Sequence, residues 1–346
     1  MMVIRLSTHG WCVLIISVLV IFLYYLSSFN PIGHLKGEVI SVRRLLTRCI
    51  HLSEEAGGLI KSIHYMNNLN SRIKSGGTLK KELLTDADLG SHRIIVSGIS
   101  STFPELKVRS EEHVMAEHYQ SDYANNVFHS DFLNSLPNDD LFVPVTDLVV
   151  WIDPLDATQE YTEGLTEYVT VMICIVLHNR PIAGIVHQPF LNKTYWGWGS
   201  YARSLDLQSA IETRKALPPK GTLSVTYSRS HLNESRMQGL IKLVAPNQVH
   251  FIPAGGSGSS SFKVISVIKG DADLYVHPSS TRRWDVCAAQ AVLESAGGRL
   301  TGLDGSLLEY APKADPVIPS KIGLFGAADQ KSYDIWIDRM YKFFKT

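Results

Sequence analysis

Closely spaced apolar runs in the middle of the chain constrain its fold more than any other feature. They cover residues 148–152, 169–177, 182–187 and 195–198, and the turn at 178–181 joins two of them. Short apolar runs bounded by turn residues are typical of buried strands. Because tight turns join antiparallel neighbours, the sequence predicts an antiparallel sheet here.

The pattern changes after Pro218 and Pro219, where strand-like and helix-like segments begin to alternate. Such alternation is typical of an α/β arrangement. We therefore expect two domains, one of helices and antiparallel sheet at 36–218 and an α/β domain at 219–346. The second domain should contain strands at 223–227, 250–252 and 273–277 and helices at 232–244, 260–269 and 285–296.

Two helices are predicted before the sheet. Apolar residues recur at helical spacing over 39–63. A second helix should begin at Thr85 or Asp86, because either side chain can cap it, and should run to about residue 101. Asp88 therefore falls in the first turn of the second helix.

The segment Gly10–Phe29 is an apolar run of about twenty residues without a charge. It predicts a single transmembrane helix that follows a short tail at 1–9 and anchors the chain in a membrane. A cleaved signal peptide is the alternative, but no small-x-small cleavage motif closes the run before Pro31. Basic residues lie on both sides of the run, so charge alone leaves the orientation open.

The charge balance limits the partners. The chain has 33 basic and 33 acidic residues, so it lacks the net positive field that holds a nucleic-acid polymer through counterion release. A small anionic molecule bound at a local site fits this composition better.

Four cysteines are present, and Cys12 lies in the predicted anchor. Cys49, Cys174 and Cys287 are scattered without the paired spacing of a metal site. Three cysteines outside the anchor imply at least one free thiol. We expect Cys174 and Cys287 to be buried structural residues.

A pair of carboxylates follows the first predicted strand. Asp153 and Asp156 are three residues apart, with Pro154 fixing the backbone between them. We expect the two side chains and the Leu155 carbonyl to share one turn. Hard cations such as Mg²⁺ take oxygen ligands, so this turn predicts a metal site.

Other acidic residues could complete such a site. Glu111 and Glu112 lie between a short predicted strand at 106–108 and a polar surface excursion at 113–147, and Asp285 begins a predicted helix. Taken singly, each has an ordinary structural explanation: Asp-Pro is a common turn, Glu-Glu is usually a solvated face, and Asp285 could be a helix cap.

The order of four short elements resembles the inositol monophosphatase superfamily of metal-dependent, lithium-sensitive phosphatases. The elements are Thr85 to Asp88, Glu111-Glu112, the run 153–158 (DPLDAT) and Trp284-Asp285 with Ala296-Gly297-Gly298 downstream. The resemblance covers nearly all of the chain after the anchor. It implies a layered αβαβα sandwich of the inositol monophosphatase and fructose bisphosphatase type, preceded here by the single N-terminal transmembrane helix.

Within the superfamily, four further segments resemble the bisphosphate nucleotidases, which remove the 3'-phosphate of adenosine 3',5'-bisphosphate. They are DPLDATQEYTEGL at 153–165, SRSH at 228–231, Gly255-Gly256 and Arg283-Trp284-Asp285. The anchor and Ile4-Arg5-Leu6-Ser7 resemble Golgi-resident members of this branch. This resemblance implies a single-pass type II protein of the Golgi membrane, whose lumenal domain clears a by-product of sulfation.

The resemblance also implies roles for individual residues. Two or three Mg²⁺ ions would be held by Glu111, Asp153, Asp156, Asp285 and the Leu155 carbonyl. Thr158 and Asp88 would orient and deprotonate the attacking water. The residues expected to bind the nucleotide are Ser228, His231, Gly256, Gly258 and Lys263.

One departure from the family pattern lies beside that pocket. The family usually has Gly-Gly-Ala-Gly, one residue and then Lys, whereas Ser259, Ser260 and Ser261 are added here before Lys263. Arg282 and Arg283 could attract a second phosphate, but a solvated basic pair is the simpler interpretation.

Two other functions stay open at this stage. The chain could hydrolyse an inositol or sugar phosphate, or it could be a catalytically silent, membrane-anchored binding module. A homodimer is also open. Asn192 and Asn233 both begin acceptor sequons for N-glycosylation, which can be used only on the lumenal side of the membrane.

Overall fold

The protein is described by a computed structural model that divides into two compact units, Met1–Val39 and Ile40–Thr346. Apart from Val39, the described elements of secondary structure belong to the second unit. The structure describes residues 38–66, 70–73, 83–112, 136, 140–217, 221–227, 238–239, 241–243, 248–253 and 260–345.

A six-stranded sheet forms the centre of the second unit, and its strands follow the order β10-β9-β8-β7-β6-β4. The strands from β6 to β10 are antiparallel, as predicted, whereas β4 is parallel to β6. A parallel pair needs a long connection, and the segment 111–147 supplies one. The strands are β4 (Lys107–Ser110), β6 (Leu148–Asp156), β7 (Thr170–Leu177), β8 (Arg180–Gln188), β9 (Lys193–Trp198) and β10 (Ala202–Arg203).

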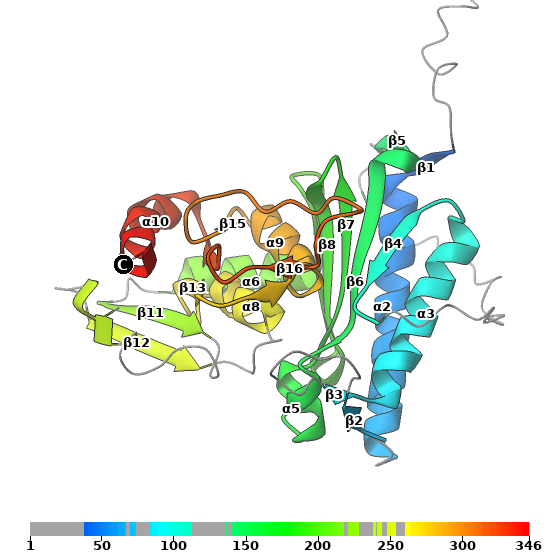
Figure 1. Ribbon diagram of the computed structural model, residues 1–346, viewed down its shortest axis with the longest axis horizontal. Coiled ribbons are helices and arrows are strands. Elements are labelled where there is room, and N and C mark those ends of the chain that lie inside the picture. The colour runs from blue at the N-terminus through cyan, green and yellow to red at the C-terminus, as the bar shows by residue number, and fades with distance from the viewer. Residues whose placement is uncertain are drawn as a thin grey trace, which may run out of the picture. The chain divides into compact units, whose positions relative to one another are not determined.

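Helices cover both faces of this sheet (Figure 1). One face packs against α2 (Val42–Tyr65) and α3 (Asp86–Thr102), and the other against α9 (Arg283–Ser295). The α9 helix approaches so closely at Gly184 that a Cβ there would lie 2.4 Å from the Ala288 carbonyl oxygen. The same layer contains α6 (Leu205–Ala216) and α8 (Ser260–Lys269), which pack against each other.

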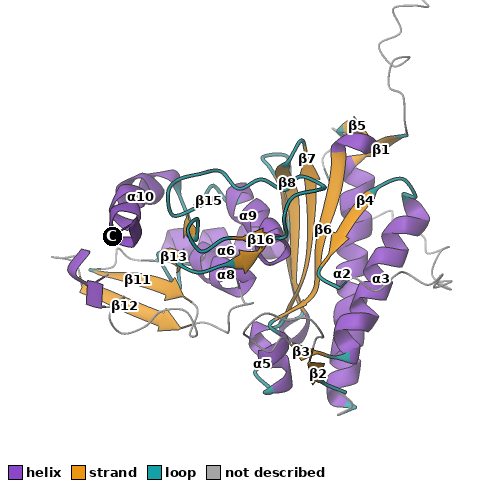
Figure 2. Cartoon of the chain, viewed as in Figure 1, coloured by secondary structure: helices purple, strands orange, loops and turns teal. Residues whose placement is uncertain are grey.

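A second, five-stranded sheet follows this helical layer, with strand order β12-β11-β13-β17-β15. Its outer neighbour is α10 (Gln330–Lys345), which packs on β17. The resulting order of layers is αβαβα, as the resemblance implies (Figure 2). The strands are β11 (Thr222–Tyr227), β12 (Gln248–Pro253), β13 (Leu274–His277), β15 (Arg299–Thr301) and β17 (Leu324–Ala327).

Short elements complete the unit. They are β1 (Val39–Ser41), β2 (Arg72–Ile73), β3 (Leu83–Leu84), β5 (Phe142–Pro144), β14 (Thr281–Arg282), β16 (Val317–Ile318), the helix α5 (Thr158–Thr162) and the 3₁₀ turns Val145–Asp147, Thr166–Tyr168 and Pro189–Leu191.

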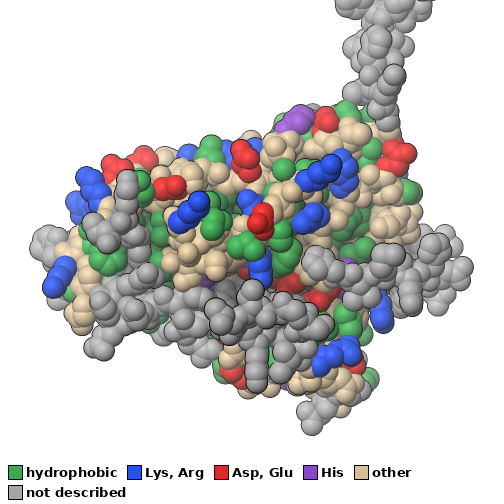
Figure 3. All heavy atoms as spheres, in the orientation of Figure 1, with side chains coloured by type: hydrophobic (Ala, Val, Ile, Leu, Met, Phe, Trp, Pro, Cys, Tyr) green, Lys and Arg blue, Asp and Glu red, His purple; other side chains and the backbone are tan. Residues whose placement is uncertain are grey.

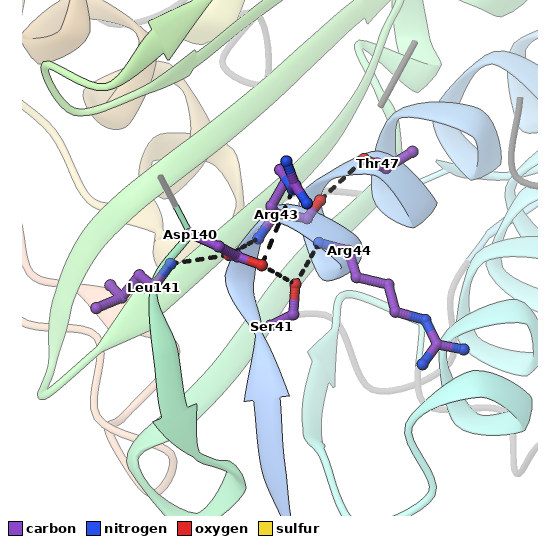
Figure 4. A network of polar contacts seen from close by, with 6 residues as sticks. All are labelled: Ser41, Arg43, Arg44, Thr47, Asp140 and Leu141. Atoms are coloured by element: carbon purple, nitrogen blue, oxygen red, sulfur yellow. Dashed lines mark hydrogen bonds and ion pairs between the residues drawn. The ribbon is translucent and has the colours of Figure 1, made fainter. Parts of the chain in front are cut away.

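Asp140 holds the start of α2 (Figure 4). Its carboxylate accepts hydrogen bonds from the Ser41 hydroxyl at 2.5 Å and the Arg43 amide at 3.0 Å, about a hundred residues earlier in the chain. The Ser41 hydroxyl in turn caps α2 by accepting from the Arg44 amide at 3.0 Å. This is why α2 begins at Val42 and not at the predicted residue 39.

A disulfide joins the central sheet to α9. Cys174 on β7 and Cys287 on α9 are buried and bonded, whereas Cys49 is a buried free thiol. The expected burial of Cys174 and Cys287 and the expected free thiol are both confirmed. The pairing itself was not predicted, because spacing in the sequence does not report which strand faces which helix.

Two predicted segments fall largely or wholly outside the described residues. The helix at 232–244 is described only at 238–239 and 241–243, and the anchor Gly10–Phe29 is not described at all. Among the described residues, no helix has the length and apolar character needed to cross a bilayer.

Candidate metal centre

The end of β6 carries the two aspartates that the sequence singled out. The sequence predicts a turn after Ile152, which is wrong: β6 continues to Asp156 and stays paired with β7. A register shift between Asp153 and Asp156 bends the strand at this point. Such a bulge re-aims side chains without ending the strand, so both carboxylates stay on a rigid element.

Glu111, Asp153 and Asp285 converge on one point. Each offers a carboxylate oxygen, and these three atoms lie within 4.8 Å of one another. Asp153 and Asp285 are buried, and Figure 3 shows acidic side chains gathered over β6 near the centre of the visible face. Buried like charges are unfavourable unless a cation compensates them, so this cluster fits a metal ion.

Asp156 lies beside the cluster but outside that 4.8 Å group. Its carboxylate is buried, and its Oδ1 atom has no hydrogen-bond partner among the described residues. A buried oxygen of this kind is suited to a ligand that the protein itself does not supply. The donors are all oxygens, which matches a hard cation such as Mg²⁺.

The carboxylates have strongly perturbed acidities when no metal is bound. Burial, followed by the negative charge of Glu111, raises the pKa of Asp285 to about 7. Burial and neighbouring carboxylates also raise the pKa values of Asp153 and Asp156 well above their ordinary range. The positive charge of Lys263 acts in the opposite direction on Asp156. Metal binding here must therefore displace protons.

Asp285 combines the two roles that the sequence left open. Its Oδ2 atom accepts hydrogen bonds from the Thr281 hydroxyl at 2.8 Å and the Arg282 amide at 2.9 Å, so it caps α9. The same side chain contributes an oxygen to the acidic cluster. Because the two hydrogen bonds hold Asp285 Oδ2, they also fix the orientation of the whole Asp285 carboxylate.

Thr158 and Asp88 form a second polar pair beside the carboxylates. The Thr158 hydroxyl lies 3.1 Å from Asp88 Oδ1 and 3.2 Å from the Leu155 carbonyl. Ala157 adopts a left-handed backbone with φ of 69°, which turns the chain from β6 into α5 and places Thr158 at the helix start. The other Asp88 oxygen accepts from the Thr85 amide at 2.7 Å in a capping box, so Asp88 is held firmly.

The residues expected to bind nucleotide are described only in part. Lys263 on α8 is completely buried, and its charge acts on Asp156. Ser228, His231, Gly256 and Gly258 lie outside the described residues.

Arg283 has a structural task. Its guanidinium donates to the carbonyls of Glu309, Asp315 and Val317, so it holds the 309–317 segment and is not a solvated cation. This use of its donors gives no support to phosphate attraction by Arg283.

Sequence reasoning missed three hydroxyl residues that contact the aspartates. The Thr281 hydroxyl donates to Asp285 Oδ2, and the Ser261 hydroxyl donates to Asp156 Oδ2 at 3.0 Å with Thr170 next to it. The Thr-x-x-x-Asp spacing and the run of serines were the available signals. Neither could be assigned without knowing which segments meet.

The chain belongs to the inositol monophosphatase family, whose sequence model matches residues 42–335. It is therefore a phosphatase of a metal-dependent family, and the resemblance seen in the sequence is confirmed. A putative inositol monophosphatase 3 of Drosophila melanogaster is 31% identical over 346 residues, which is 98% of this chain and 94% of the relative. The Golgi-resident adenosine 3',5'-bisphosphate 3'-phosphatase of Rattus norvegicus is 33% identical over 288 residues, which is 79% of this chain and 75% of the relative.

Solved structures agree on the fold. CysQ from Bacteroides thetaiotaomicron, a bacterial member of the same family, superposes with a TM-score of 0.55 at 23% identity. The match covers 82% of this chain and 96% of CysQ. It supports the mixed α/β sandwich described above.

Proposed function

We propose that this protein is a Mg²⁺-dependent phosphatase that removes the 3'-phosphate of adenosine 3',5'-bisphosphate, giving AMP and phosphate. The observation that carries the proposal is the convergence of Glu111, Asp153 and Asp285, with Asp156 and the Thr158–Asp88 pair beside them. Phosphoryl transfer needs charge neutralisation and a positioned nucleophile, and these residues are suited to both tasks.

The carboxylates and the Leu155 carbonyl would hold two or three Mg²⁺ ions. Bound Mg²⁺ supplies positive charge to the reacting phosphate and lowers the pKa of a water ligand. In this proposal the Thr158 hydroxyl donates to Asp88, which leaves the lone pairs of the hydroxyl oxygen free to accept a proton from the attacking water. Asp88 takes up the threonine proton, and Thr85 keeps the Asp88 carboxylate in place.

The nucleotide pocket in this proposal consists of Ser228, His231, Gly256 and Gly258, and Lys263 adds a positive charge. A glycine-rich turn that leads into a helix offers free backbone N–H groups to a phosphate, and α8 begins at Ser260. Similarity to the rat relative, which is named as a bisphosphate 3'-phosphatase, supports this substrate. Similarity to the Drosophila relative, which is named as a putative inositol monophosphatase, supports an inositol phosphate instead.

The location proposed is the Golgi membrane, with Gly10–Phe29 as a type II anchor and the phosphatase in the lumen. The Golgi-resident relatives support this location. The Cys174–Cys287 disulfide supports the lumenal orientation, because disulfides persist in oxidising compartments and are rare in the cytosol.

Steady-state kinetics on three substrates test the proposal. The purified chain should hydrolyse adenosine 3',5'-bisphosphate with a kcat/KM about ten to a hundred times that for adenosine 3'-phosphate, since the second phosphate adds a charge-assisted contact. Inositol 1-phosphate should be a poorer substrate than either nucleotide. A preference for inositol 1-phosphate would replace the proposed substrate, and no Mg²⁺-dependent turnover of any of the three would refute the phosphatase assignment.

A further inference from the structure

The added serines of the glycine-rich segment lead directly into the metal site. Ser260 and Ser261 are the first two residues of α8, and both are almost completely buried. Their hydroxyls have different partners: Ser260 lies 3.1 Å from the Tyr275 hydroxyl, and Ser261 donates to Asp156 Oδ2 at 3.0 Å. Only the second contact reaches a carboxylate of the proposed metal centre.

Thr170 on β7 completes this contact. Its hydroxyl lies 2.7 Å from the Ser261 hydroxyl and 3.5 Å from Asp156 Oδ2. A hydroxyl has one proton to donate, and the Ser261 proton is used on Asp156, so Thr170 donates to Ser261. Ser261 therefore donates to Asp156 Oδ2 and is itself supported by Thr170, whereas Asp156 Oδ1 has no hydrogen-bond partner within the described parts of the chain.

The three aspartates of the site differ in where their anchoring donors come from. The Asp153 carboxylate accepts from the Leu155 amide at 3.2 Å, two residues away, and Asp285 accepts from residues three and four positions before it. The Ser261 hydroxyl lies 105 residues from Asp156 in the sequence. Asp156 is thus oriented by α8, an element of the other half of the fold.

We propose that Ser261, supported by Thr170, is a positioning residue for the metal centre. It fixes Asp156 through Oδ2 so that Oδ1 is presented to the metal ion. Hydrogen bonds of this kind restrict the rotation of a ligating carboxylate, and their loss typically weakens metal binding about tenfold to a hundredfold. The inference rests on the proposed function, because it assigns Asp156 to the metal.

Isothermal titration calorimetry, in which Mg²⁺ is added to the metal-free chain, tests the inference without using activity. Ser261→Ala should weaken the apparent Mg²⁺ affinity by about tenfold or more. Ser260→Ala is the matched control, since it removes the neighbouring buried hydroxyl whose partner is Tyr275. Its Mg²⁺ affinity should stay within about twofold of wild type. The loss in Ser261→Ala should also appear as a higher Mg²⁺ concentration for half-maximal turnover, with an unchanged substrate KM at saturating Mg²⁺.

Thr170→Val provides a second variant, because it keeps the side-chain shape and removes only the hydroxyl. It should weaken Mg²⁺ binding less than Ser261→Ala, and the double variant should lose less than the two single effects combined, since the hydroxyls act in sequence. If Ser261→Ala fails to fold, an unchanged Mg²⁺ affinity in folded Thr170→Val overturns the proposal.

Two failures can be told apart. If the wild-type chain binds no Mg²⁺, the proposed function is wrong. If wild type binds Mg²⁺ and Ser261→Ala binds it as tightly as Ser260→Ala does, the proposed function stands and Ser261 only satisfies a buried oxygen.

Discussion

A substitution at Asp156 can test the role of its negative charge without changing the shape of the side chain. Asp156→Asn keeps the size of the side chain and a carbonyl oxygen for Ser261, but removes the negative charge. We expect kcat to fall by at least about a hundredfold, equivalent to roughly 3 kcal/mol, because charge neutralisation at the phosphate is lost. Steady-state kinetics in saturating Mg²⁺, together with circular dichroism to check the fold, measure this effect.

The control for this change is Asp304→Asn, at an exposed aspartate whose carboxylate accepts only from the nearby Ser306 amide among the described contacts. Its kcat should match wild type. Near-normal turnover in Asp156→Asn as well would mean that Asp156 is not a metal ligand.

Thr158 should affect chemistry and leave metal binding intact. Thr158→Val removes the hydroxyl that reaches Asp88 and keeps the side-chain shape. We expect kcat to fall by about a hundredfold to ten-thousandfold, the range for loss of a positioned proton acceptor, with an unchanged Mg²⁺ affinity. Thr162→Val on the same short helix is the control, because its hydroxyl bonds only the Gln159 carbonyl among the described contacts. Equal losses in both variants would point to α5 folding and not to catalysis.

The raised pKa values of the buried aspartates make the stability of the metal-free protein sensitive to pH. Asp285 has a pKa of about 7 in the folded chain and an ordinary value of 3.8, so folding favours its protonated form. The contribution of Asp285 to the free energy of unfolding is fully present below about pH 4 and is lost as the pH rises through 7. In EDTA, the melting temperature should therefore fall between pH 5 and pH 8, and saturating Mg²⁺ should reduce that fall by replacing the displaced protons.

Differential scanning fluorimetry across this pH range checks the effect, with Asp285→Asn as the comparison. The variant should show a shallower pH dependence in EDTA. A wild-type melting temperature that stays constant or rises from pH 6 to pH 8 in EDTA would contradict the expectation.

At the residue scale, the sequence predicted the carboxylates better than their supports. Glu111, Asp153 and Asp285 were expected together, and the structure brings them together, because their short motifs carry the information. Ser261 and Thr170 could not be predicted, since each depends on a contact between elements distant in the chain. Lys263 was expected to bind the nucleotide, and its complete burial could not be predicted because it depends on how α8 packs.

At the scale of elements, the Cys174–Cys287 disulfide ties α9 to β7. Reduction should lower the melting temperature of wild type by several degrees, because a disulfide typically contributes about 2 to 4 kcal/mol. The double variant Cys174→Ala/Cys287→Ala should melt lower than wild type and should not respond to dithiothreitol. Thermal melts with and without reductant measure both effects.

The double variant also controls for the cysteines outside the cross-link, since Cys12 and Cys49 both remain in it. A wild-type melting temperature unaffected by complete reduction would contradict a stabilising cross-link. A reductant effect that persists in the double variant would assign it to the remaining cysteines, Cys12 and Cys49.

The elements themselves were largely predictable where their pattern is local. The bounds of α8 match the predicted 260–269, and α3 begins after Thr85, one of the two residues predicted to cap it. The helix α10 and strand β17 were not predicted, although they complete the second sheet and its cover. The parallel pairing of β4 was also missed, because register and direction depend on long-range contacts.

At the scale of the whole molecule, glycosylation reports the side of the membrane. Asn192 is exposed, so its side chain is accessible for glycosylation. Its backbone is left-handed, with φ of 51°. Expressed in mammalian cells, the chain should show a glycosidase-sensitive mobility shift that Asn192→Asp abolishes. Aspartate is preferred to glutamine for this test because it tolerates the left-handed backbone.

Protease protection in sealed vesicles supplies the control for this test. The folded unit should survive protease unless detergent is added, whatever the glycosylation of Asn192. Digestion of the unit in intact vesicles would reverse the proposed orientation.

The anchoring of Asp140 has a consequence for how the molecule could be divided. The chain leaves β4 just before Glu111 and is fixed again at Asp140 by Ser41 and Arg43. A break introduced within 113–135 would leave one piece with α2, α3, β4 and Glu111, and another with β6, α9 and the three aspartates. Each piece would carry an incomplete metal centre, and we expect the β4–β6 pairing and the Asp140 contacts to favour association of the two pieces. Recovery of Mg²⁺-dependent phosphatase activity on mixing the two pieces would report their reassembly.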